Sequence, residues 1–112
     1  MRSTLAAGLG ALALLVTLPA SPAAAADGAF SYTYVGPGGI SLRHHLTNPE
    51  SGECIIIPET VGNNFPALAP NNDTNATATV FHDTNCEGDV FYVMNPGRHL
   101  SRRLELRSVI FS

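Results

Sequence analysis

The sequence predicts an all-β domain, a sandwich or small barrel built from short strands. After residue 26, no window shows the apolar period of about 3.6 residues that is typical of an amphipathic helix. Apolar and polar side chains instead alternate over short runs, as they do in strands that bury one face. Turn-forming clusters of Gly, Pro, Asn and Asp separate these runs about every 8–12 residues.

The first expected strand, residues 30–35, alternates aromatic and polar residues. This alternation places Phe30, Tyr32 and Tyr34 on one face of the strand. The following Gly-Pro-Gly-Gly segment favours a turn, so residues 40–46 are expected to return as the second arm of a hairpin.

A short apolar strand is expected at Cys54–Ile57, after a turn cluster at residues 48–52. Its continuous β-branched run is typical of a central strand that is covered on both faces. Pro58 ends this strand. Glu59–Ala76 follows, and these 18 residues show no strand or helix pattern. We interpret them as one long irregular loop. Loops of this kind are often functional, and a plain surface loop held in place by Phe65 is the alternative.

The second half of the chain returns to a β pattern. Strands are expected at residues 77–82 and 89–94, with a turn between them. After the Asn-Pro-Gly turn comes a polar stretch, residues 98–103, and then a closing strand at residues 104–111.

The N-terminal segment, residues 1–26, has the three-part layout of a secretory signal peptide. Arg2 gives the positive head, Leu5–Leu18 is an apolar run of 14 residues, and small residues follow up to Ala26. That run is shorter than the ~20 residues of a permanent membrane span. We therefore expect a secreted, extracellular protein with no permanent membrane span, whose mature part is a single all-β domain at residues 27–112.

The two cysteines, Cys54 and Cys86, both lie in the mature part. In an oxidising compartment such a pair predicts a disulfide; two free thiols or half of a metal site are the alternatives. Closing a loop of this length stabilises a fold by roughly 3–4 kcal/mol. A small domain needs such a covalent link because it buries only a modest fraction of its surface.

Charge excludes one class of partner. Without Arg2 the mature chain has five Arg, no Lys and nine Asp or Glu, a net charge of −4 with His neutral. Nucleic-acid binding needs a surplus of basic residues that displace counterions, so no nucleic-acid partner is expected. Four arginines gather between residues 98 and 107; we interpret them as a solvated face, with anion recognition as the alternative.

Residues 78–112 resemble a βγ-crystallin Greek-key motif. The motif has an aromatic residue, a second aromatic five positions later, a glycine two beyond that, and a later serine. Here Phe81, Cys86, Gly88 and Ser108 stand at these positions. Gly88 would supply the positive φ of a folded hairpin, Phe81 would cover it, and the Ser108 hydroxyl would bond its backbone. Cys86 departs from the pattern, and the first half of the chain carries no clean copy.

The resemblance implies a Greek-key β-sandwich that is βγ-crystallin-like and holds one disulfide. Many microbial relatives bind calcium through oxygen ligands that end at the motif serine. Here Arg103, Leu104 and Arg107 occupy positions that should offer oxygens, so no metal and no other cofactor is expected. The resemblance also extends to small actinobacterial exported proteins, a metalloproteinase inhibitor and a killer-toxin-like protein.

Catalytic chemistry is not expected. Adjacent His44 and His45 point to opposite faces of a strand and do not readily share a metal, although His44 could meet His82 or His99 in space. His82 has a neighbouring carboxylate, Asp83, but no serine stands in a nucleophile elbow. A disulfide leaves no thiol nucleophile, so we expect a protein that is not an enzyme.

The expected function is that of a small secreted binding domain. Its partner would be a protein, such as an extracellular protease that it inhibits or the target of a toxin-like interaction. The alternative is a cell-envelope polymer or a passive structural role, and the domain is expected to be a monomer. The candidate contact residues are Asn63, Asn64, Phe65 and Pro66, at the centre of the long loop.

Overall fold

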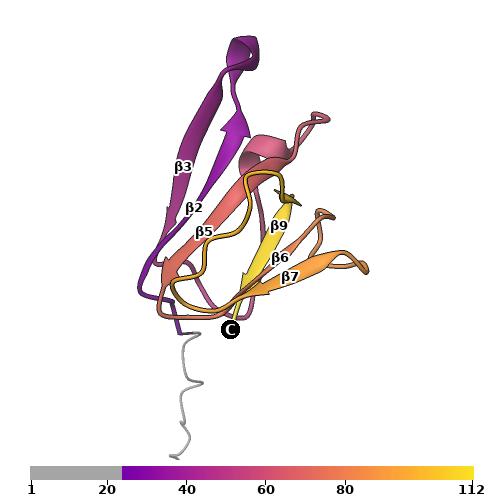
Figure 1. Ribbon diagram of the computed structural model, residues 1–112. Coiled ribbons are helices and arrows are strands. Elements are labelled where there is room, and N and C mark those ends of the chain that lie inside the picture. The colour runs from indigo at the N-terminus through magenta and orange to yellow at the C-terminus, as the bar shows by residue number, and fades with distance from the viewer. Residues whose placement is uncertain (1–23) are drawn as a thin grey trace, which may run out of the picture.

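The computed structural model describes residues 24–112, so the apolar run of the expected signal peptide lies outside the described residues. In this part of the chain, two four-stranded antiparallel sheets form the two layers of the domain (Figure 1). One sheet has the order β3-β2-β5-β8, with strands Ser41–Thr47, Gly28–Val35, Ala67–Thr74 and Glu105–Leu106. The other has the order β4-β9-β6-β7, with strands Cys54–Ile56, Ser108–Phe111, Ala78–Phe81 and Phe91–Met94.

The two halves of the chain follow the same path. In the first half, β2, β3 and β5 share one sheet while β4 joins the edge of the other. In the second half, β6, β7 and β9 share the second sheet while β8 joins the edge of the first. Each half therefore exchanges its third strand with the other, which ties the two sheets into one domain.

The core lies between the sheets. Phe30 and Tyr32 of β2 are fully buried, and Phe30 meets Phe111 of β9 edge to face with ring centroids 5.4 Å apart. Tyr34 packs against the same cluster, which confirms the sequence-based prediction that these alternating aromatic residues share one face. The expected hairpin is also confirmed, because β2 pairs with β3 from Ala29↔Thr47 to Val35↔Ser41.

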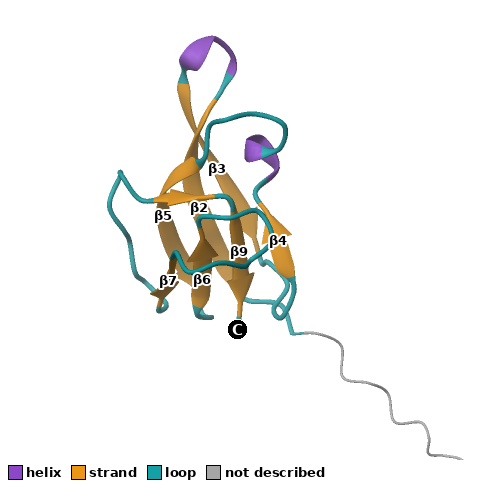
Figure 2. Ribbon diagram, turned by 90° about the vertical axis from the view of Figure 1, so that its right-hand side faces the viewer, coloured by secondary structure: helices purple, strands orange, loops and turns teal. Residues whose placement is uncertain are grey.

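The far end of this hairpin projects beyond the sandwich, with the short 3₁₀ turn η2, Pro37–Gly39, at its tip (Figure 2). A second 3₁₀ turn, η3, spans Pro58–Thr60 and follows β4 directly.

The irregular loop expected at Glu59–Ala76 is wrong in its second half, because β5 lies there as a central strand. β5 contains Pro70, which lacks an N–H and argues against a central strand in a sequence. A β-bulge accommodates it. The pairing of β5 with β2 shifts between Ser31 and Thr33, and Ala69 has a φ of 55° just before the proline.

The expectation of a central strand at Cys54–Ile57 is also wrong. β4 is only three residues long, pairs with β9 alone and lies at the edge of its sheet, so Ile56 stays 43% exposed. The expected closing strand at residues 104–111 divides at Arg107 into β8 and β9, which belong to different sheets. Apolar composition alone does not distinguish an edge strand from a central one.

The disulfide between Cys54 and Cys86 is confirmed, with Cα atoms 5.9 Å apart. It joins the edge strand β4 to the loop between β6 and β7, across 32 positions of the sequence. In the chain-entropy account a loop of this size stabilises the fold by about 4 kcal/mol. The bond therefore joins an edge strand to a loop, two segments that make few backbone hydrogen bonds with the rest of the sheet.

Candidate functional site

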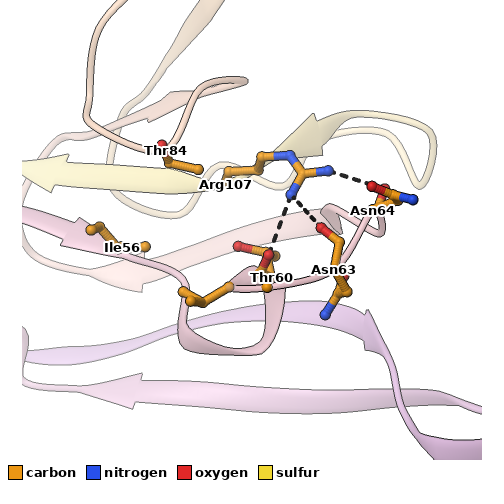
Figure 3. A pocket seen from close by; sticks show the side chains of 8 residues that line it. Ile56, Thr60, Asn63, Asn64, Thr84 and Arg107 are labelled. Carbon is orange, nitrogen blue, oxygen red and sulfur yellow. Dashed lines mark hydrogen bonds between the residues drawn. The ribbon is translucent and has the colours of Figure 1, made fainter.

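The candidate site is the loop that connects η3 to β5, Val61–Pro66, here called the binding loop (Figure 3). It contains all four contact residues that the sequence singled out. Gly62 has a φ of 80° and turns the chain outward after η3. Val61 is 63% exposed and Phe65 is 56% exposed, so the loop presents two large apolar side chains to solvent.

Arg107 holds the backbone of the binding loop from the side of the protein. Its guanidinium donates to the carbonyl oxygens of Thr60 at 3.3 Å, Asn63 at 3.4 Å and Asn64 at 3.0 Å (Figure 3). Arg107 occupies the single position between β8 and β9, where the chain passes from one sheet to the other. One cationic side chain therefore holds the loop at Asn63 and Asn64 and the residue directly before it, Thr60.

Local bonds within the loop reinforce this brace. The side chain of Asn63 accepts a hydrogen bond from the N–H of Phe65 at 2.7 Å and donates to the carbonyl of Glu59 at 3.0 Å. Such an asparagine turn fixes the backbone direction immediately before Phe65. Pro66 follows and limits its own φ, so the exposed Phe65 lies between two conformationally restricted residues.

A polar cluster anchors η3 to the first sheet. The hydroxyl of Tyr32 donates to Glu59 Oε1 at 2.7 Å, and His44 Nδ1 lies 3.0 Å from both that hydroxyl and Glu59 Oε2. Burial of the ring, followed by the hydrogen bond and the negative charge of Glu59, raises the pKa of Tyr32 well above its ordinary value. The phenol is therefore a hydrogen-bond donor and not a nucleophile.

A hollow of about 430 Å³ lies beside the binding loop, between Ile56, Thr84 and Arg107. Its rim carries the exposed apolar side chains of Ile56 and Val61. Residues 24–112 contain no free cysteine, and the arginine in this hollow is occupied by carbonyl oxygens. The hollow therefore gives the protein a concave surface with an apolar rim, which is suited to contact with a partner.

The residues that carry the sequence resemblance, Phe81, Cys86, Gly88 and Ser108, gather around the β6–β7 loop. The Ser108 hydroxyl accepts a hydrogen bond from the N–H of Cys86 at 2.9 Å and donates to the carbonyl of Asp83 at 2.5 Å. Gly88 has a φ of 99°, and a Cβ there would collide with the Asp83 carboxylate. Phe81 packs against Phe91 of β7, with ring centroids 5.7 Å apart.

The histidines do not converge. His44 contacts Glu59, His82 contacts Glu105 with Nε2 3.2 Å from Oε1, and His99 contacts Asp73 at 3.0 Å. In the described part of the chain, no group of three or more His, Cys, Asp or Glu side chains is arranged to hold a metal ion.

Arg107 does not belong to a purely solvated face, as the sequence suggested, because its guanidinium donates to three backbone carbonyls. Its buried neighbours Leu106 and Ser108 show that its side chain must point away from the core. No pattern in the sequence indicates that three loop carbonyls lie in that direction, since they are 43–47 positions away along the chain.

Comparisons with protein-family models, with curated proteins and with solved structures each gave no match. Over residues 24–112 the structure contains no helix long and apolar enough to span a membrane. A functional proposal for this protein therefore depends on its own residues and their geometry.

Proposed function

We propose that this protein is a secreted binding domain that inserts its binding loop into a concave site on a partner protein, as a protease inhibitor does. The observation that carries the proposal is the brace from Arg107 to two carbonyls of an otherwise exposed loop and to the carbonyl of Thr60 directly before it. A braced loop loses little conformational entropy when it binds, so more of the contact energy appears as affinity.

Phe65 is the proposed anchor of the interface. Interface energy concentrates in a few side chains, often aromatic, that fill pockets on the partner. Phe65 is more than half exposed, its backbone N–H is held by Asn63, and Pro66 restricts the chain directly after it. Val61 and Ile56 extend the apolar contact surface on either side of the 430 Å³ hollow.

An extracellular site of action supports the same proposal. Residues 1–26 have the composition of a signal peptide. Cleavage after Ala26 would leave β2 whole, because that strand begins at Gly28, and would remove the buried Ala26 with its N–H bond to the Pro49 carbonyl. The Cys54–Cys86 disulfide is compatible with an oxidising compartment. We therefore propose that the mature domain acts outside the cell.

We also infer a Greek-key fold of the βγ-crystallin type. Two observations support it: the repeated strand path of the two halves, and the two hydrogen bonds of Ser108 to the β6–β7 loop. β5 of the first half contains no serine.

The test is inhibition of a panel of extracellular serine and metalloproteases by the mature domain, followed by mapping of any cleavage in the domain. We expect slow-dissociating inhibition of at least one protease with the binding loop left intact. Phe65→Ala should weaken this inhibition at least about tenfold, the effect of losing one aromatic hot spot. Arg107→Ala should weaken inhibition and expose the loop to cleavage.

Phe91→Ala is the matched control, because Phe91 is a half-exposed aromatic residue on the distant edge strand β7. It should leave inhibition unchanged. If no protease is inhibited and every protease cuts at Phe65, inhibition is refuted. If Phe91→Ala and Phe65→Ala weaken inhibition equally, the binding loop is not the contact surface.

A further inference from the structure

A second hollow, of about 460 Å³, lies on the outer face of the β3-β2-β5-β8 sheet and shares no lining residue with the hollow beside the binding loop. Its volume falls within the range of about 300–1,000 Å³ that is typical of small-ligand sites. We call it the outer-face hollow. It is lined by Thr33, Ser41, Leu68, Ala69, Arg102 and Arg103.

The bulge in β5 and a braced turn shape this hollow. Ala69, in the bulge, donates its N–H to the carbonyl of Leu104 at 3.3 Å. The turn before Leu104 is closed by its own N–H to the Ser101 carbonyl at 3.0 Å and by Arg103 N–H to Ser101 Oγ at 3.1 Å. Arg102 and Arg103 therefore extend from a fixed turn that is bonded to the sheet.

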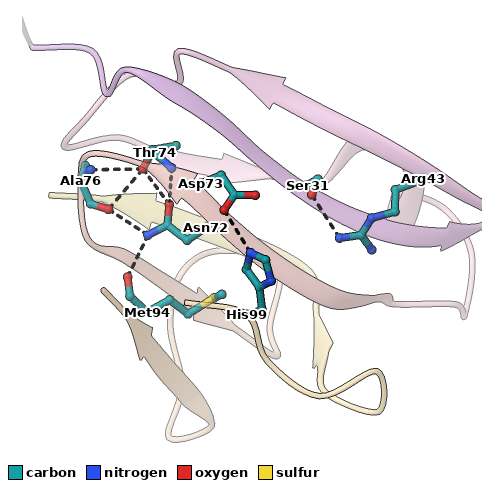
Figure 4. Close-up of polar contacts among 8 residues, drawn as sticks. All are labelled: Ser31, Arg43, Asn72, Asp73, Thr74, Ala76, Met94 and His99. Carbon is teal, nitrogen blue, oxygen red and sulfur yellow. Dashed lines mark hydrogen bonds and ion pairs between the residues drawn. The ribbon is translucent and has the colours of Figure 1, made fainter. Parts of the chain in front are cut away.

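The charge around the hollow is positive and unpaired. Within residues 24–112, no arginine nitrogen lies within 4.0 Å of a carboxylate oxygen, and the ion pairs there all involve histidine. Arg43 adds to this charge from beneath the hollow. Its guanidinium donates to Thr33 Oγ1 at 2.7 Å and to the Ala69 carbonyl at 3.1 Å. It also donates to Ser31 Oγ at 3.1 Å (Figure 4), and all three acceptors are neutral.

The carboxylates nearest along this sheet already have partners. Glu105, opposite Leu68 in the pairing of β8 with β5, contacts His82, and Asp73 contacts His99 (Figure 4). No carboxylate belongs to the described residues that line the hollow. The mature chain has nine acidic residues and five arginines, so its net charge is negative. The positive charge at this hollow is therefore a local arrangement and not a consequence of net charge.

The other lining residues restrict the ligand further. Leu68 and Ala69 give an apolar surface, while the hydroxyls of Thr33 and Ser41 give hydrogen-bonding groups. A sugar ring presents both an apolar C–H face and hydroxyl groups, and an arginine fork suits a phosphate or a carboxylate. We propose that the outer-face hollow binds a saccharide unit that carries a phosphate or carboxylate group.

This site goes beyond the proposed function and does not depend on it, because the two hollows share no lining residue. It gives the protein a means of attachment to acidic glycans while the binding loop remains free.

The test is titration of the ¹⁵N-labelled mature domain with glucose 6-phosphate, glucuronate, glucose and inorganic phosphate at low ionic strength. We expect saturable shifts of the amides of Thr33, Ser41 and Leu68 with one or both acidic sugars, and the stronger of the two identifies the preferred group. Glucose should give no shifts, and phosphate should bind at least about tenfold more weakly than the better sugar.

The variant pair is Arg102→Ala/Arg103→Ala against Arg98→Ala. Arg98 is an exposed arginine of the same segment that does not line the hollow. The double variant should lose at least about tenfold in affinity, and the Arg98 variant should stay within about twofold. Equal losses in both would show diffuse electrostatic attraction. Phosphate binding as tightly as the sugars, or no saturable shift with either acidic sugar, would also refute the proposal.

Discussion

Replacing Asn72 by Asp exchanges one NH₂ group for an oxygen at a fully buried position of β5. In the native domain, Asn72 Nδ2 donates to the carbonyls of Ala76 at 2.8 Å and Met94 at 2.9 Å. Its Oδ1 accepts from the N–H of Thr74 at 3.2 Å and from the Thr74 hydroxyl at 2.7 Å (Figure 4). The amide thus joins β5 to the β5–β6 connection and to β7.

An ionised carboxylate cannot donate to the two carbonyls, so the new carboxyl group should remain protonated in the folded state. The unfolded chain loses this proton above a pKa of about 3.9, and holding it at pH 7 costs about 4 kcal/mol. The protonated group has one O–H for two carbonyls, and the unsatisfied carbonyl costs about 1–3 kcal/mol more. The total, about 5–7 kcal/mol at pH 7, compares with about 4–13 kcal/mol for a domain of this size.

The assay is urea unfolding of the variant and the native domain, compared at each pH between 4 and 7. The difference in unfolding free energy should fall by about 1.4 kcal/mol per pH unit on acidification and reach about 1–3 kcal/mol near pH 4. Asn85→Asp is the control, because Asn85 is exposed in the β6–β7 loop and its replacement makes the same chemical change away from the interior. A difference at Asn72 that is below 1 kcal/mol at pH 7, or constant with pH, would refute this account.

Three further outcomes test the fold. Removing the disulfide with Cys54→Ala/Cys86→Ala should lower the unfolding free energy by about 4 kcal/mol, measured by urea denaturation; an effect below 1 kcal/mol would mean that the unfolded chain is not entropically restrained by the bond. Ser108→Ala removes two hydrogen bonds to the β6–β7 loop and should cost about 1–3 kcal/mol, with faster hydrogen exchange confined to that loop; uniform exchange would contradict a local role. The raised pKa of Tyr32 makes the folded state hold a proton that the unfolded chain loses above pH 10, so this contribution is complete below pH 10 and is lost at about 1.4 kcal/mol per pH unit above it. Tyr32→Phe should remove this slope in denaturation between pH 9 and 11, and an unchanged slope would assign it to other groups.

The difference between the expected and observed fold is largest in β5. Local rules assign Pro70 and its Asn- and Asp-rich surroundings to a loop, since proline removes a ladder donor. The strand forms because the bulge at Ala69 places the proline where no donor is needed, and because the Asn72 amide is fully bonded in the interior. Both conditions depend on neighbouring strands, which are distant in sequence.

The candidate site shows the same division. Asn63–Pro66 was identified from composition, and the loop does lie at the surface with Phe65 exposed. The conformation of the loop was not predictable, because Arg107, whose side chain holds its backbone, is distant from the loop in the sequence. The unpaired state of Arg102 and Arg103 is likewise a property of the assembled surface.

By itself, the sequence determined the β architecture, the buried aromatic face of β2 and the disulfide. The first two follow from local sequence, because alternation with a period of two sets the faces of a strand. The disulfide follows because two cysteines allow only one intramolecular pair. The tertiary structure alone decided which strands are central, which arginine braces the binding loop and where positive charge remains unpaired. Those features arise from contacts between residues far apart along the chain, and no local pattern encodes them.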